Sequence, residues 1–296
     1  MAKYRALIIA GGALFALARS AGAADLLPPP PALEPPPPAA VEFNGWYLRG
    51  DTGVGISANA PSLFNSPDPI ASAAPGYYTA TATQAFNNSS ISAAGNFDLG
   101  IGYQFNNWFR FDVTGEYRGG SHFQSLYVLN DAGNAVGPSQ LADFYRGDIA
   151  SWVGLVNGYI DLGTWYGITP YVGAGVGLAR NTLFGMTDQG QVTIGGATGP
   201  SGGYFSDGSK TDFAWALMTG VDFDVTQNLK LELGYRYLDL GKYASGGSHC
   251  LGVCGGGVAN YVVSKNDLAY SDFRVGLRWM IGEETYPQPQ PLVRKY

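Results

Sequence analysis

The sequence is poor in the residues that most catalytic and metal sites use. Only 14% of its 296 residues are charged, and it contains two histidines and two cysteines. So few imidazole and thiol groups leave little material for a metal centre, or for a nucleophile paired with a base. Basic residues are also outnumbered by acids, because the net charge is −6. An acidic chain without a basic patch is a poor nucleic-acid binder, so no nucleic-acid partner is expected.

Long apolar runs are missing as well. After the N-terminus, no run of about eighteen apolar residues occurs, so the sequence predicts no transmembrane helix. The mean hydropathy is −0.02, as expected where apolar and polar residues alternate and cancel. The chain is instead rich in glycine (43), tyrosine (19) and phenylalanine (15). A chain of alternating strands with an aromatic face has this composition, and a hydropathy scan overlooks it.

Residues 96–118 show the alternation most clearly, with one interruption at Asn106 and Asn107. Successive side chains of a strand point to opposite faces, so the stretch predicts two strands joined by a tight turn. One face is apolar and aromatic, and the other is charged and rich in glycine. Each strand has about ten residues, the length that a tilted strand needs to cross a bilayer. The apolar face comprises Phe97, Leu99, Ile101, Tyr103, Phe105, Phe109, Phe111, Val113 and Tyr117.

The same pattern predicts six more strands, and the connections between strands alternate between long and short. A soluble sheet packed on a second sheet could also alternate, but it would not explain this asymmetry. The sequence therefore predicts an all-β fold, an eight-stranded antiparallel transmembrane β-barrel with long extracellular loops and short periplasmic turns. An even strand count places both termini in the periplasm and leaves no unpaired edge in lipid. The long loops are expected at about residues 57–92, 119–143, 181–210 and 241–265.

Four tryptophans are expected at the periplasmic strand ends, where they would form an aromatic girdle. Inside the barrel, acidic and basic side chains are nearly balanced. An eight-stranded barrel is just wide enough for side chains to fill it, so these charges predict a salt-bridged plug, with a small ion path as the alternative. The girdle consists of Trp46, Trp108, Trp165 and Trp279. The predicted lumen charge network is Arg49, Asp51, Arg110, Asp112, Glu116, Arg118, Glu232, Arg236, Arg274 and Arg278, to which the parity adds Asp98, Asp212, Asp222 and Lys230.

Four segments organise the chain. Residues 1–23 have a basic start, a short apolar core and a small-residue cleavage site, which is typical of a secretory signal peptide. Residues 24–43 form a Pro-rich periplasmic spacer, which is expected to be extended and semi-rigid. Residues 44–281 form the barrel. Residues 282–296 form a periplasmic C-terminal tail, whose prolines forbid a further strand.

Few residues are candidates for chemistry. Ser121 and His122, with an acid from a loop, could form a hydrolytic triad, although most loop histidines are only solvated. Cys250 and Cys254 are expected to form a disulfide in an oxidising compartment, and with His249 they could instead form a partial metal site. We therefore expect no catalytic residues, no metal and no cofactor.

Together these features resemble the small eight-stranded outer membrane β-barrels of alphaproteobacteria, of the Rhizobiales type and usually labelled "porin family". The resemblance lies in Ala-Asp-Leu at residues 24–26 before the prolines, Asn-Gly-Trp-Tyr-Leu-Arg-Gly-Asp at 44–51, Thr-Pro-Tyr-Val-Gly-Ala-Gly-Val-Gly at 169–177 and Phe-Arg-Val-Gly-Leu-Arg at 273–278. It covers the signal peptide and the barrel, but not the loops. One departure is Ile281, which stands where family barrels usually end in an aromatic residue, and the tail follows it.

The resemblance implies an envelope protein without enzymatic activity, in the cell outer membrane, in contact with lipid and lipopolysaccharide and folded by the barrel-assembly machinery. In related barrels, a mature N-terminal alanine before aspartate is joined to peptidoglycan by L,D-transpeptidases, and Ala24 and Asp25 match that pattern. The expected function is structural: a barrel that supports envelope integrity and is tethered to peptidoglycan. The alternatives are a narrow porin for small solutes and a loop-mediated adhesin or haem-binding surface protein.

Overall fold

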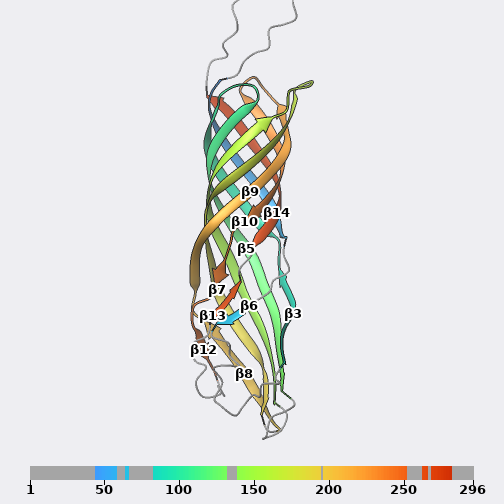
Figure 1. Ribbon diagram of the computed structural model, residues 1–296, viewed down its shortest axis with the longest axis vertical. Coiled ribbons are helices and arrows are strands. Elements are labelled where there is room, and N and C mark those ends of the chain that lie inside the picture. Colours follow the sequence, from blue (N-terminus) through green and yellow to red (C-terminus); the bar gives the residue numbers. More distant parts are fainter. Residues whose placement is uncertain are drawn as a thin grey trace, which may run out of the picture. The chain divides into compact units, whose positions relative to one another are not determined.

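The alternating segments fold into eight long strands that close into a ring. The computed structural model describes residues 44–58, 64–66, 83–131, 139–194, 196–251, 262–265 and 268–281. Around the ring each strand is antiparallel to both neighbours, and the last strand pairs with the first (Figure 1). The fold class predicted from the sequence is confirmed. The ring runs β1 (Gly45–Ser57), β4 (Ala94–Gln104), β5 (Phe109–Asp131), β6 (Ser139–Asp161), β7 (Ile168–Ile194), β9 (Gly208–Asp224), β10 (Leu229–Asp239) and β14 (Ala269–Ile281).

Closure between β1 and β14 removes the edge that an open sheet would present to lipid. Trp46 pairs with Ile281 and the register continues without a break to Ser57 and Tyr270. Because lipid offers no hydrogen bonds, a spanning sheet must satisfy every backbone group internally. Among the described residues, no helix is long and apolar enough to cross a membrane.

The outer face of the barrel is a broad apolar band bordered by aromatic rings. The four tryptophans predicted to share one end do so, and each is more than half exposed. At the other border, Tyr117 and Trp152 lie side by side with ring centroids 4.8 Å apart. Aromatic rings prefer the interface between lipid and water, so these two belts mark the borders of the membrane-spanning part. The exposed apolar residues between the belts include Leu48, Leu99, Ile101, Val113, Val156, Val172, Val176, Leu233, Val275 and Leu277.

Three strands continue far beyond the belt of Tyr117 and Trp152, which corrects two of the predicted loops. Residues 119–143 and 181–210 were expected to be loops, but β5, β6 and β7 run through most of them and only residues 132–138 and 195 lie outside the description. The reason is a β-bulge, where an extra residue shifts which face the next side chains occupy. In β5 the register shifts between Arg118 and Ser121, and Gly120 adopts a left-handed φ of 78°. The inward positions are even before the bulge and odd after it, so simple parity ends the strand too early.

The extension carries additional short strands that were also expected to be loop. β3 (Thr83–Ile91) pairs with β5, β8 (Ala197–Phe205) with β7, and β12 (Ser248–Cys250) with β8. A separate three-stranded sheet consists of β11 (Tyr243–Ala244), β13 (Val262–Lys265) and β2 (Phe64–Ser66). Figure 1 draws the barrel with its short turns at the top and this extension at the bottom.

A hydrophobic core fills the outer part of the molecule and continues into the membrane-spanning part at Val153, Leu155, Tyr159, Tyr171 and Met218. Its side chains point inward from the extension and from the barrel strands. Burial of so many aromatic rings stabilises the extension by the hydrophobic effect and closes the outer mouth of the barrel. This core includes Ala94, Phe123, Tyr127, Tyr145, Ile149, Leu183, Met186, Phe205, Leu238, Leu240, Tyr243, Leu268 and Tyr270.

Candidate functional site

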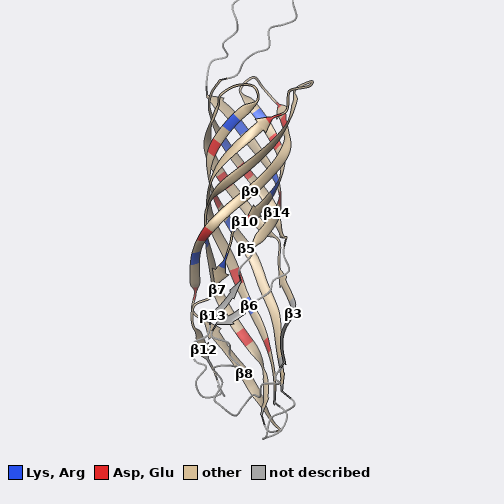
Figure 2. Cartoon of the chain, viewed as in Figure 1, with Lys and Arg blue, Asp and Glu red and all other residues tan. Residues whose placement is uncertain are grey.

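The candidate functional site is the lumen of the membrane-spanning barrel. All ten charged residues of the predicted lumen network lie inside it, each paired with an opposite charge and no more than 7% exposed at the side chain. Four more acids complete the set: Asp98, Asp161, Asp222 and Asp272. In Figure 2 the coloured charged positions concentrate along the barrel and are sparser in the extension.

Two residues from the wider parity set lie elsewhere. Lys230 pairs with Asp224 at 2.6 Å, close to the short turn between β9 and β10, where both side chains are partly exposed. Asp212 accepts hydrogen bonds from the backbone N–H groups of Phe213 and Lys242, at the outer end of β9. Parity alone therefore overestimated the lumen network at the strand ends, where inward-facing residues meet solvent.

The charges nearest the short turns form what we call the periplasmic tier, with three arginines and four acids. Arg49 donates to Asp112 at 2.9 Å and contacts Glu232 at 2.8 Å. Arg110 lies 3.1 Å from Asp161 and 3.4 Å from both Asp222 and Glu232. The members of this tier are Arg49, Arg110, Arg278, Asp112, Asp161, Asp222 and Glu232.

A second group, the outer tier, lies nearer the extension and again combines three arginines with four acids. Arg236 contacts Glu116 at 2.5 Å and Asp272 at 2.6 Å. Arg118 binds the same two acids, at 2.9 and 2.7 Å. The members of this tier are Arg118, Arg236, Arg274, Asp51, Asp98, Glu116 and Asp272. Arg49 also holds Asp51 through two hydrogen bonds of 2.9 and 3.0 Å, which connects the two tiers.

Tyrosine rings occupy the space between the arginines. The guanidinium of Arg110 lies 4.3 Å from the ring centroid of Tyr159 and 4.8 Å from that of Tyr171, distances typical of cation–π contacts. Glycines on the neighbouring strands make room for these rings. A Cβ at Gly173 would come within 2.5 Å of the Tyr159 ring, and one at Gly220 within 2.7 Å of the Tyr171 hydroxyl. The glycines of the inner face therefore leave the space that the lumenal tyrosine rings occupy.

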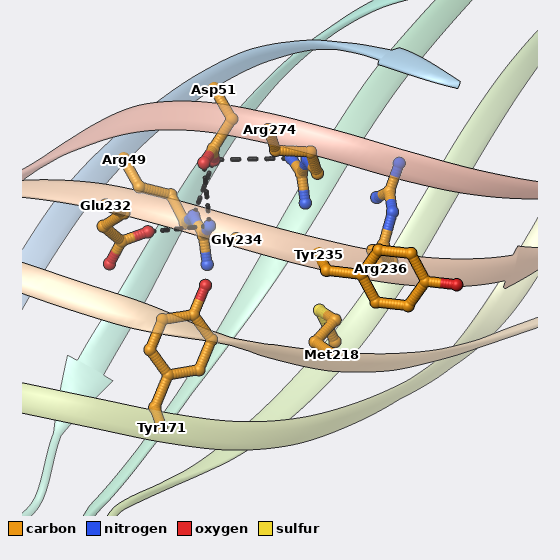
Figure 3. Close-up of a pocket in the computed structure, with 9 residues that line it drawn as sticks. All are labelled: Arg49, Asp51, Tyr171, Met218, Glu232, Gly234, Tyr235, Arg236 and Arg274. Atoms are coloured by element: carbon orange, nitrogen blue, oxygen red, sulfur yellow. Dashed lines mark hydrogen bonds and ion pairs between the residues drawn. The ribbon is translucent and has the colours of Figure 1, made fainter. Parts of the chain in front are cut away.

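Little empty space remains among these side chains. Figure 3 shows Arg49, Asp51, Glu232 and Arg274 joined by ion pairs around a small cavity, with the Tyr171 hydroxyl directed at them. The cavity offers about 10 Å³, roughly the room that one water molecule needs. Around this cavity the lumen is thus packed with side chains, and the hydrophobic core lies on its outer side.

The candidate hydrolytic pair of the sequence does not assemble. Ser121 points inward, is fully buried and shares a 2.8 Å hydrogen bond with the Tyr270 hydroxyl. His122 points outward, with its side chain 77% exposed, and binds Asp148. Adjacent residues of one strand face opposite sides, so this serine and this histidine cannot act on one substrate.

The second histidine has contacts that sequence reasoning missed. The Ser206 hydroxyl and Nε2 of His249 are 2.8 Å apart, and the imidazole stacks on Tyr204 with centroids separated by 4.7 Å. Within the described ranges, no group of three or more His, Cys, Asp or Glu side chains is arranged to hold a metal ion. Cys254 lies outside the described residues, as do Ala24 and Asp25, so the disulfide and the attachment site remain predictions.

Two acids, Asp143 and Asp188, lie near one another in the extension, well outside the membrane-spanning part. Asp143 pairs in register with Tyr127 of β5, far beyond the Tyr117 belt. Burial, with a further contribution from Asp188, raises the pKa of Asp143 to about 6, although the Ser201 hydroxyl donates a 2.6 Å hydrogen bond to it. An ionised carboxylate buried in this way costs free energy, so the extension is sensitive to pH.

A family model described as an outer membrane protein beta-barrel domain matches residues 13–280. An uncharacterised protein of Brucella suis is 32% identical over 66% of this chain and 67% of its own length. A Rickettsia canadensis protein named as a candidate adhesin is 30% identical over 68% of this chain and 75% of its own. The crystal structure of Neisserial surface protein A aligns with 81% of this chain and 99% of its own, at 19% identity and a TM-score of 0.40.

Proposed function

This chain belongs to the outer membrane β-barrel family and lies in the cell outer membrane, and from that premise we propose that it is a non-conducting structural barrel that supports envelope integrity. The observation that supports the proposal is the filled lumen. Both charged tiers span the cross-section, and the cavity between them is only about 10 Å³. A role of this kind requires neither catalysis nor a cofactor.

The energetics of the tiers favour a plug over a path for ions. Arg236 and Arg118 each bind the same two acids, so each arginine fixes its neighbours as well as its partners. Breaking a buried ion pair by removing one partner costs about 3–5 kcal/mol, because the other charge is left without compensation. A permeating ion would have to separate several such pairs at once. It would then meet the hydrophobic core, whose aliphatic and aromatic side chains solvate an ion poorly.

Planar-bilayer recording tests the plug directly. We expect the purified, folded protein to insert without producing single-channel current steps, while a conducting porin examined in parallel produces them. The matched variant is Arg236→Ala combined with Arg118→Ala, which removes two guanidiniums from the outer tier. Stable, ion-selective steps from the wild-type protein would show that the lumen conducts and would favour the narrow porin.

We further propose that Ala24 ties this barrel to peptidoglycan. The support comes from the Ala24-Asp25 pattern and from the spacer, which could reach on the order of 60 Å at about 3.1 Å per residue. β1 begins at Gly45 at the end with the short turns, the end that faces the periplasm in outer membrane barrels. The spacer therefore precedes the barrel on the side where the wall lies.

Mass spectrometry of lysozyme-digested, detergent-washed sacculi from the native host tests the tether. We expect a peptide that begins with Ala24-Asp25 and carries a muropeptide. If all Ala24 N-termini are free while the protein is present in the outer membrane, the tether is wrong and the barrel is unaffected. Replacing Asp25 by alanine, with Ala24 retained, provides the control for recognition of the dipeptide.

The extension favours a second candidate, a surface adhesin. β5, β6 and β7 carry β3, β8 and β12 well beyond the membrane belts, and a relative is named as a candidate adhesin. Deleting residues 187–205 would remove the β7–β8 hairpin and leave the membrane-spanning ring intact. Loss of binding to host surfaces by this variant, with normal folding, would support adhesion. Haem binding that disappears in both His122→Ala and His249→Ala would instead support the haem alternative.

A further inference from the structure

The lumen contains more acid than base. Eight carboxyl groups and six guanidiniums lie inside the barrel, none more than 7% exposed at the side chain. The excess is divided evenly, because each tier has four acids and three arginines. In the described part of the chain, the nearby Lys230–Asp224 pair is itself neutral and changes nothing. If every acid were ionised, the interior would hold two uncompensated negative charges.

Two uncompensated charges inside a low-dielectric barrel are too costly to persist. A buried carboxylate without a partner either takes up a proton or holds a cation. The cavity between the tiers offers little room for a cation, because it measures about 10 Å³ and its two acids, Asp51 and Glu232, are already paired with Arg49. Its lining contains three guanidiniums, of Arg49, Arg236 and Arg274, against these two carboxylates, and this excess of positive charge disfavours a metal ion. Protons are the neutralising species that the space allows.

In the outer tier the contacts single out Asp98. It is directly opposite Asp51 on β1 and opposite Glu116 on β5, so acids flank it on both neighbouring strands. Arg274 of β14 is its one close ion pair, and Arg236 of β10 stays 3.9 Å away. Its Oδ1 atom has no hydrogen-bond partner among the described residues, and the residue is fully buried.

The other acids of the outer tier are better compensated. Asp272 accepts from both Arg118 and Arg236, at distances of 2.6 to 2.9 Å. Glu116 is held by the same two arginines. Asp51 accepts two hydrogen bonds from Arg49, which belongs to the other tier. Three acids of this tier therefore have strong cationic partners. Asp98 has only Arg274 close by, and Arg274 also contacts Asp51.

In the periplasmic tier the same comparison points to Asp222. It lies directly opposite Glu232 in the register of β9 and β10, so the two carboxyls compete for the same arginines. Arg278 of β14 binds it, Arg110 of β5 is 3.4 Å away, and Asp161 of β6 is a further acid in its field. Its Oδ1 also lacks a partner within the described ranges, and the residue is fully buried.

Asp112 and Asp161, by contrast, have no acid directly opposite them on a neighbouring strand. Asp112 receives hydrogen bonds from Arg49 at 2.9 Å, from the Tyr47 hydroxyl at 3.1 Å and from the Asn157 amide at 2.7 Å. Asp161 is opposite Tyr171 rather than an acid, and it lies at the strand end next to the short turn. Like charges placed directly opposite one another are the feature that separates Asp222 from these two.

We infer that the native lumen holds two bound protons, one on Asp98 and one on Asp222. Each tier is then electrically neutral, with three carboxylates, three guanidiniums and one neutral carboxylic acid. A neutral carboxylic acid can also donate a hydrogen bond, which a carboxylate cannot. This inference concerns the charge state of the lumen and does not depend on the peptidoglycan tether or on adhesion.

Isosteric amides test the assignment, because an amide imitates a neutral carboxylic acid but not a carboxylate. We expect Asp98→Asn and Asp222→Asn to unfold in urea at the wild-type midpoint in lipid vesicles. The matched controls, Asp272→Asn and Glu116→Gln, remove ionised partners of two arginines and should reduce the folding equilibrium constant at least about a hundredfold. An equal loss in Asp98→Asn and Asp272→Asn would overturn the assignment of the outer-tier proton, and an equal loss in Asp222→Asn that of the other.

Infrared spectroscopy of the wild-type protein provides a readout that needs no variant to fold. At pH 8, where Asp143 with its pKa of about 6 is ionised, we expect a C=O stretching band of protonated carboxylic acid, whose intensity falls by half in each single amide variant and vanishes in the double variant. The same band must persist at high ionic strength, since both groups are enclosed. Absence of a protonated-carboxyl band from the wild-type barrel would refute the inference outright.

Discussion

Arg118 and Ser121 both point into the barrel and both contact Tyr270, although they are three positions apart in one strand. The guanidinium of Arg118 lies 4.5 Å from the Tyr270 ring centroid, and Ser121 forms a 2.8 Å hydrogen bond with its hydroxyl. The bulge at Gly120 makes this possible. It switches the inward parity of β5 where the charged tiers end and the apolar core begins.

This bulge predicts an effect of replacing Gly120. A Cβ at this position would meet no atom within 4 Å, but the φ of 78° is unfavourable for any L side chain. We therefore expect Gly120→Ala to reduce the free energy of unfolding by about 1–2 kcal/mol. The matched control is Gly115→Ala, which also has open space around it but no left-handed φ, and it should be nearly neutral. Urea unfolding in vesicles, followed by tryptophan fluorescence, compares the two, and equal effects would show that the φ is not the cause.

Buried ion pairs of the lumen and the partly exposed pair near the short turn should differ strongly in their contribution to the free energy of unfolding. Arg236 is 2% exposed at the side chain and binds two acids, so we expect Arg236→Met to cost about 3–5 kcal/mol through the carboxylates left behind. Lys230→Met removes the partly exposed pair with Asp224 and should cost less than about 1 kcal/mol. Free energies of unfolding measured in the same vesicles decide the comparison. Similar losses of stability in the two variants would mean that water enters the lumen and screens its charges, as solvent does at the short turn.

The pH dependence of the extension should follow Asp143. The pKa of this carboxyl is raised to about 6, above its usual value, so the folded state retains a proton that the unfolded chain has released. Its contribution to stability is therefore fully present below the unfolded pKa near 4 and is lost as the pH rises through about 6. The loss should be on the order of 2–3 kcal/mol.

Comparing wild-type protein with Asp143→Asn isolates this contribution from other titrating groups. The free energy of unfolding should fall between pH 4 and pH 8 by more in the wild type than in the variant. Asp188, which faces Asp143 and raises its pKa, provides a second check. Asp188→Asn should shift the wild-type transition to lower pH. Identical pH profiles for the wild type and Asp143→Asn would contradict the assignment.

The apolar band predicts a dependence on depth for charged substitutions on the outer face. Val156 is 53% exposed and lies in the apolar band on β6, between Trp152 of the outer belt and the periplasmic end of the strand. We expect Val156→Arg to cost about 2–4 kcal/mol, the penalty for arginine near the bilayer midplane. Thr182→Arg, on the outer face of the extension, should cost less than about 1 kcal/mol. Free energies of unfolding measured in detergent micelles and in vesicles should both show the larger loss for Val156→Arg. A larger loss for Thr182→Arg would place the membrane elsewhere on the barrel.

Much of this protein could be predicted from alternation alone. The faces of a strand follow from local parity, which any ten consecutive residues reveal, so the ten lumen charges and the lipid-facing band were recoverable without coordinates. The four tryptophans also share their predicted end, because their positions follow from the strand boundaries. The count of eight strands rests on the same reasoning, since each short turn is local in the chain.

Other features depended on neighbours that parity does not reveal. The bulge near Gly120 arises where β5 leaves the ring and gains new pairing partners, so a strand that continues was mistaken for a loop. Ser121 and His122 were adjacent candidates that the pleat separates to opposite faces. The contact between Ser206 and His249 joins residues 43 positions apart and gave no signal in the sequence.

The sequence by itself determined that this chain is a barrel with an apolar outside and a charged inside, because apolar and polar residues alternate with the two-residue period of a β-strand. Only the tertiary structure decided which charge meets which. Arg118 and Asp272 are 154 residues apart in the chain and 2.7 Å apart in the lumen. That pairing depends on the register of eight strands around a closed ring, and a shift of one residue in any strand would turn these charges toward lipid.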